Sequence, residues 1–256
     1  MKKLRKSNFL EWNNDIFISS IKKINISIIL IIILDALFYI LSGYFAALWL
    51  QRVQAKMAAF NVPPDIMSLG YEKASQLVSD VKEFYYLIVL SFVILLVAVI
   101  FLASILKCII WARTTNTKIT FNLISKFLGL NLVWMGFWFA LLLLVSLFVE
   151  PASAPKFMLI TIALGLYFTN TLYPIFIKKP GLKSIIHSVR LNIAKIHLFL
   201  LPYAVIGLVL FIIVRLASLL KFQHSTILLG MIIVVFAAVA RYYISALVFE
   251  IEKAAK

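Results

Sequence analysis

Ionisable residues inside long apolar stretches are the first place to look for chemistry in this sequence. Asp35, Arg215 and Arg241 qualify. Placing such a group in hydrocarbon costs about 2.5–3.5 kcal/mol or more, so each is a functional candidate. At a rise of about 1.5 Å per residue, Asp35 lies about 14 Å and Arg241 about 8 Å from the same predicted membrane boundary. The gap of about 6 Å is within the reach of an arginine side chain. We predict an Asp35–Arg241 pair.

Asn170 is a third member of this predicted polar cluster, because it falls about 10 Å from the same boundary. Its run, Thr169–Pro174, combines polar residues with a helix-breaking proline, a pattern typical of discontinuous helices at transport sites. Arg215 lies near the opposite boundary, where it can reach the headgroups. The expected neighbours of the cluster are Tyr39, Asn131 and Tyr242.

Two interpretations of the cluster Asp35, Asn170 and Arg241 stay open. The functional one is a path for protons or solute through the inner half of a helix bundle. The structural one is a neutralised pair that fixes helix packing, with Pro174 as a simple kink. A continuous polar cavity reaching Asp35 and Asn170 would favour the first, and a dry, packed bundle the second.

Other site chemistry has no support in the sequence. We find no nucleotide-binding, zinc-protease or serine-hydrolase motif, and therefore predict no catalytic residue, no enzymatic activity and no cofactor. The three histidines lack the spacing of metal ligands, so no metal site is predicted. Cys108 is the only cysteine, which excludes an intrachain disulfide, and is interpreted as a buried apolar side chain.

Six long apolar runs must position these residues. Hydrophobic residues make up 64% of the 256-residue chain and charged residues 14%, with a mean hydropathy of +1.05. Each run reaches the length of about 20 residues that a membrane-spanning helix needs. We predict an all-α bundle of six transmembrane helices forming a single transmembrane domain, 1–256, with spans at about 25–50, 84–106, 127–149, 157–177, 198–220 and 227–249.

The net charge of +15 is unevenly distributed over the segments between the runs. Seventeen basic residues fall on one predicted side and six on the other, where acidic residues offset them. Excess Lys and Arg in short loops marks the cytoplasmic side. We therefore expect a multi-pass protein of the cell membrane with both termini cytoplasmic. Anionic lipid headgroups on the inner face explain the charge better than nucleic acid does.

Amphipathic segments precede three of the runs on the basic side. The first segment carries apolar residues at helical spacing from Phe9 to Ile24, and another does so from Leu182 to Ile196. A less regular one begins at Phe121. Such patterns are typical of helices lying in the headgroup region. The alternative is that each segment is only the solvated end of its span.

The first outer connection, Gln51–Glu83, is the longest. Asn61-Val62-Pro63-Pro64 interrupts it, whereas Gln51–Phe60 and Tyr71–Glu83 can extend the flanking helices. We expect an outer helical cap over 51–83, either a structural lid or a recognition surface.

The layout resembles that of six-helix prokaryotic membrane proteins akin to the membrane domain attached to some glycerophosphodiester phosphodiesterases. The resemblance covers most of the chain, with segments such as Gly181-Leu182-Lys183-Ser184-Ile185-Ile186 leading into a span, and it implies no catalytic residues. We expect a non-enzymatic accessory, scaffold or lipid-organising protein. The alternative is a transporter or a permease subunit working with a separate ATPase. Its expected partners are membrane lipids, other proteins or a second copy of the chain.

Overall fold

A computed structural model describes residues 9–58, 70–219 and 225–255, and within these ranges the chain forms eight helices and no strand. Six of the helices are long and apolar enough to cross a membrane, which confirms the predicted all-α fold. They are α2 (Ser27–Ala58), α3 (Tyr71–Thr114), α4 (Phe121–Phe148), α5 (Ala154–Lys178), α7 (Ile196–Ser218) and α8 (Ser225–Ala255). The two short helices are α1 (Phe9–Lys22) and α6 (Leu182–Ala194).

Helices α2 and α3 are longer than the apolar runs that predicted them. Their 32 and 44 residues correspond to about 48 and 66 Å, against about 30 Å of hydrocarbon. The expected helical extensions of the cap are present, because α2 continues to Ala58 and α3 begins at Tyr71. The predicted break at Asn61-Val62-Pro63-Pro64 lies outside the described residues.

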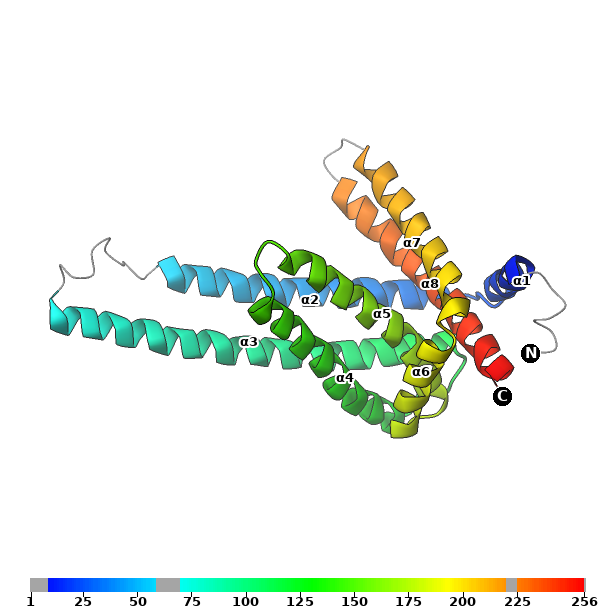
Figure 1. The fold of residues 1–256 in the computed structure, drawn as a ribbon, viewed down its shortest axis with the longest axis horizontal. Helices are drawn as coiled ribbons and strands as arrows, with labels where there is room; N and C mark the ends of the chain where they lie inside the picture. The colour runs from blue at the N-terminus through cyan, green and yellow to red at the C-terminus, as the bar shows by residue number, and fades with distance from the viewer. Residues whose placement is uncertain (1–8, 59–69, 220–224, 256) are drawn as a thin grey trace. The chain divides into compact units, whose positions relative to one another are not determined.

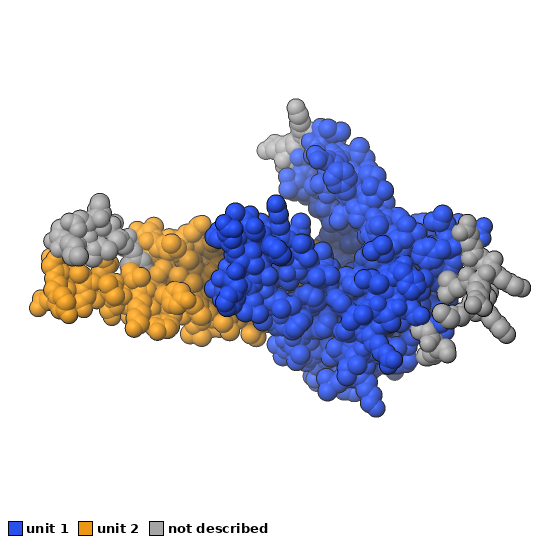
Figure 2. Space-filling model, viewed as in Figure 1, with its two compact units in different colours: residues 1–36, 104–256 blue, residues 37–103 orange. Residues whose placement is uncertain are grey.

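The chain divides into two compact units (Figure 2). Unit 2, residues 37–103, holds residues 37–58 of α2 and 71–103 of α3. Within it, the indole nitrogen of Trp49 donates a 3.0 Å hydrogen bond to the Ser91 hydroxyl. The Trp49 ring also packs against Phe92, with centroids 5.5 Å apart. Unit 1 comprises residues 1–36 and 104–256 and contains all of the predicted polar cluster.

Helix α8 is central to unit 1, since α1, α5 and α7 all pack against it (Figure 1). Its buried residues Leu247 and Ile251 share one apolar cluster with Ile16 of α1 and Phe199 of α7. A second cluster joins α3, α4 and α5, and there Cys108 is fully buried beside Trp111 and Phe127. Buried apolar contacts therefore hold the helices of unit 1 together.

Each of the two short helices, α1 and α6, has small polar residues that face the protein. Asn13 and Ser20 of α1 are buried, as are Ser184, Ser188 and Asn192 of α6. Leu182, Ile186 and Ile193 of α6 point outward, whereas Leu191 is buried. This orientation fits helices that lie against lipid on one side. The third predicted amphipathic segment is no separate helix: Thr120 caps α4 through a 3.2 Å bond from the Leu123 amide, so Phe121 begins the span.

Candidate functional site

A buried ion triad joins three helices of unit 1. The Asp35 carboxylate on α2 accepts a 2.7 Å hydrogen bond from the Arg241 guanidinium on α8. Its other oxygen accepts a 2.6 Å hydrogen bond from the Lys107 ammonium on α3. Asp35 is fully buried, and the side chains of Lys107 and Arg241 are 15% and 10% exposed. Both carboxylate oxygens are thus engaged by cations.

An apolar layer one helical turn away positions the triad. Ile31, Ile110 and Ala238 are fully buried in one cluster with Tyr242. Residues three or four positions apart share a helix face. Ile31 therefore directs Asp35 inward, Ile110 directs Lys107, and Ala238 directs Arg241. The same packing that excludes water from the layer brings the three charges together.

The triad carries one more positive than negative charge when all three groups are ionised. Trp111 lies one turn from Lys107 on α3, and the Arg241 guanidinium sits over its ring at 5.5 Å from the centroid. The electron-rich face of an indole attracts a cation and stabilises it where water is scarce. Trp111 thus supplies part of the compensation for the second positive charge.

The triad links three helices through a single carboxylate. The Asp35 carboxylate accepts one charge-assisted hydrogen bond from α3 and another from α8. In the folded arrangement described here, Asp35 holds α2, α3 and α8 together.

Asn170 lies elsewhere, on the side of α5 that faces α7. Its side chain, with that of Thr171, is close to the buried hydroxyl of Tyr203, although that hydroxyl makes no hydrogen bond. No hydrogen bond joins Asn170 to Asp35 or Arg241 in the described structure. Distance along the helix placed Asn170 at a suitable depth, but it does not determine which way a side chain faces.

Helix α5 passes through Pro174 without a break, from Ala154 to Lys178. Proline has no N–H, so the carbonyl of Asn170 loses its partner in the helical ladder. The residues from 171 to 177 are nevertheless all buried. The kink interpretation of Pro174 therefore fits this helix better than a discontinuous one.

Of the expected neighbours, Tyr242 lies beside the triad, whereas Asn131 has other partners. Asn131 of α4 donates a 3.0 Å hydrogen bond to Ser104 of α3 and accepts one of 2.7 Å from Tyr173 of α5. All three of these residues are buried. Tyr242 packs beside the triad in the apolar layer, while its hydroxyl is buried without a partner. Arg215 lies over the Phe211 ring at the end of α7.

Lys107 is the member of the triad that the sequence did not indicate. It stands one residue beyond the apolar run 84–106, which made it look like part of a basic loop. The structure continues α3 two further turns, to Thr114. The available signal was Cys108-Ile109-Ile110-Trp111, an apolar stretch directly after Lys107 that is typical of a helix still in contact with a core.

A second group of buried polar side chains lies where α5, α6 and α7 meet. The Thr171 hydroxyl, the Ser188 hydroxyl and both polar atoms of the Asn192 amide are buried without hydrogen bonds. The Tyr167 hydroxyl donates a 3.0 Å hydrogen bond to the main-chain carbonyl of Asn192. The rings of Tyr167 and Tyr203 pack with centroids 5.2 Å apart. Among the described residues, no group of three or more His, Cys, Asp or Glu could hold a metal ion.

Searches of family models, curated proteins and solved structures return no match to this chain.

Proposed function

We propose that this protein is a non-enzymatic integral membrane protein with an accessory or scaffold role that organises lipid or partner proteins in the cell membrane. The ion triad is the observation that carries the proposal. Lys107 and Arg241 both pair with Asp35 across helix boundaries, which is the arrangement expected of a packing contact.

A second polar connection supports the same function. The chain from Ser104 through Asn131 to Tyr173 links α3, α4 and α5, and the Trp134 indole donates a 2.8 Å bond to Thr169 between α4 and α5. Hydrogen bonds between membrane helices contribute about 0.6–2 kcal/mol each and fix their register. Polar residues in this part of the chain are placed as structural links.

The proposed topology has both termini on the cytoplasmic side. Six crossings return the chain to the side on which it began, and α1 packs against α8 through a contact between Ile16 and the cluster containing Ile251. The basic segments of the sequence favour the cytoplasm for that side.

Purification from native membranes tests the function, with bound proteins and lipids identified by mass spectrometry. We expect reproducible enrichment of particular lipids or proteins. In parallel, the protein in liposomes should pass no protons or solutes beyond the leak of empty liposomes. Flux that Asp35→Asn abolishes, in a variant that still folds, would overturn the proposal in favour of a transporter.

A further inference from the structure

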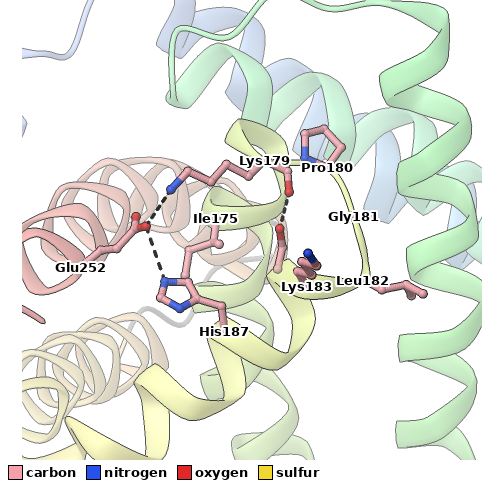
Figure 3. A pocket seen from close by; sticks show the side chains of 9 residues that line it. Ile175, Lys179, Pro180, Gly181, Leu182, Lys183, His187 and Glu252 are labelled. Atoms are coloured by element: carbon pink, nitrogen blue, oxygen red, sulfur yellow. Dashed lines mark hydrogen bonds and ion pairs between the residues drawn. The ribbon is translucent and has the colours of Figure 1, made fainter. Parts of the chain in front are cut away.

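A cavity of about 650 Å³ opens on unit 1 between the end of α5, the start of α6 and the last turns of α8 (Figure 3). Lys179 and Lys183 line it together with His187 and Glu252, and Ile175 and Leu182 add apolar surface. It lies just beyond the end of α5 and against α6, which in the proposed topology is the level of the inner lipid headgroups.

Positive charge predominates in this cavity. Glu252 is its one acidic residue, and it already binds the Lys179 ammonium at 3.1 Å and faces the His187 Nε2 at 3.5 Å. In Figure 3 these two side chains converge on Glu252, Lys179 from the residue directly after α5 and His187 from α6. Lys183 makes no ion pair within the described structure. Its charge is therefore available to an anion.

Further lysines surround the cavity. Lys178 lies over the Phe249 ring, 3.3 Å from its centroid, and it interacts electrostatically with Glu252 and with the lysines Lys23, Lys253 and Lys179. Basic residues near a membrane surface attract anionic lipid. The cavity is thus the centre of a basic region and not an isolated pair of lysines.

Helix α6 also presents an apolar ridge beside the cavity. Leu182, Ile186 and Ile193 are 79%, 71% and 64% exposed, while the small polar residues of the same helix are buried. Exposed apolar residues on one face of a helix fit contact with acyl chains.

Gly181, at the N-cap of α6, provides no side chain to cap the first-turn N–H groups at the rim of the cavity.

We propose that this cavity binds the phosphate of an anionic phospholipid, with Lys179 and Lys183 contacting the phosphate and an acyl chain lying along Leu182 and Ile186. The inference rests on the proposed lipid-organising function and names the lipid class and the site. The apolar ridge next to the lysines is what favours a lipid over a free phosphate ion.

Native mass spectrometry of the full-length protein tests the site with three probes: phosphatidylglycerol, diacylglycerol and inorganic phosphate. We expect saturable binding of phosphatidylglycerol that exceeds binding of the other two at least tenfold. If diacylglycerol binds as tightly as phosphatidylglycerol, the proposed role of the phosphate is wrong. Inorganic phosphate binding as tightly would overturn the role of the acyl chain.

Charge variants locate the binding. Lys179→Gln with Lys183→Gln should weaken phosphatidylglycerol binding about tenfold, because the two variants remove the positive charges of the cavity while Glu252 stays. The control, Lys118→Gln with Lys126→Gln, removes two exposed lysines outside the cavity and should change binding less than twofold. Lys183→Gln alone breaks no ion pair and provides the same test if the double variant folds poorly. Equal losses in the cavity variants and the control would overturn the site.

Glu252 gives a test of opposite sign. Glu252→Gln removes the acidic residue of the cavity and releases Lys179, so phosphatidylglycerol should bind several-fold more tightly. Glu250→Gln is the matched control, because Glu250 is on the same helix, pairs with Lys253 and does not line the cavity. An identical response of the two variants would overturn the inference.

The inference and the proposed function fail in distinguishable ways. If the cavity variants bind lipid normally while native purification still enriches partners, only the site is wrong. If Asp35-dependent flux appears in liposomes, the function is wrong whatever the cavity binds.

Discussion

Lys107 and Asp35 are separated by 72 positions in the sequence, yet the Lys107 ammonium lies 2.6 Å from the carboxylate oxygen that Arg241 leaves free. This contact makes the triad a junction of three helices. It also determines how much stability a substitution there removes. Loss of the single anion leaves two cations unpaired, whereas loss of one cation leaves the other paired with Asp35.

Asp35→Asn should destabilise the protein strongly. It leaves Lys107 and Arg241 close together without a counter-ion, and breaking a buried pair in this way costs about 3–5 kcal/mol. Thermal unfolding in detergent, followed by size-exclusion fluorescence, measures the effect. Asp80→Asn, an exposed position on α3, should leave the melting temperature unchanged. A stable Asp35→Asn protein would show that the triad does not hold the fold.

Removing one cation should cost less than removing the anion. Lys107→Met leaves Asp35 paired with Arg241, while Arg241→Met also removes the contact with Trp111 and should cost about 1.5–3 kcal/mol. The combination of Asp35→Asn with Lys107→Met should be more stable than Asp35→Asn alone, because only one unpaired cation then stays buried. The unmodified protein, Asp35→Asn, Lys107→Met and their combination form a double-mutant cycle, in which the four melting temperatures are compared. Strict additivity would contradict a direct charge interaction.

Tyr173→Phe and Asn131→Leu test the chain of hydrogen bonds across α3, α4 and α5. Each single variant leaves a buried partner unsatisfied, at a cost of about 1–3 kcal/mol. The double variant removes both groups of the 2.7 Å bond and should lose less stability than the sum of the two. Unfolding measured under the same conditions decides this. A sum that is simply additive would mean that the two side chains do not depend on one another.

Asn192→Leu should raise the melting temperature. Both polar atoms of the Asn192 amide are buried without hydrogen bonds, and an apolar side chain of similar shape avoids that desolvation penalty of about 1–3 kcal/mol. Ile193→Leu, on the exposed face of α6, should have little effect. A marked loss of stability in Asn192→Leu would indicate that an ordered water satisfies the amide.

Gly165 and Gly136 should respond to alanine in opposite directions. A Cβ at Gly165 would come within 3.2 Å of the Trp138 ring, whereas one at Gly136 meets nothing within 4 Å. Gly165→Ala should therefore loosen the close approach of α4 and α5. Gly136→Ala should add up to about 1 kcal/mol through helix propensity. Melting temperatures that move together would contradict the packing described for these helices.

The sequence predicted the helices well because the signal for a membrane span is long and redundant. No single residue decides whether α4 or α7 exists. Depth arithmetic also placed Asp35 and Arg241 at compatible levels, and the structure brings them together. Asn170 passed the same depth test but lies beside Tyr203, since rise per residue says nothing about rotation between helices. Lys107 was missed because a charge directly after an apolar run looks like the start of a loop. The burial of the serines of α6 could not be predicted from the sequence, because it depends on which helices pack against that face.

Cys108 follows Lys107 directly and is the chain's only thiol. Because it is fully enclosed in the described structure, alkylating reagents can reach it only when α3 separates locally from α4 and α5. The Cys108 thiol of the native protein therefore reports local opening of the interior. The rate at which it is alkylated in intact membranes would measure how often α3 separates from its neighbours.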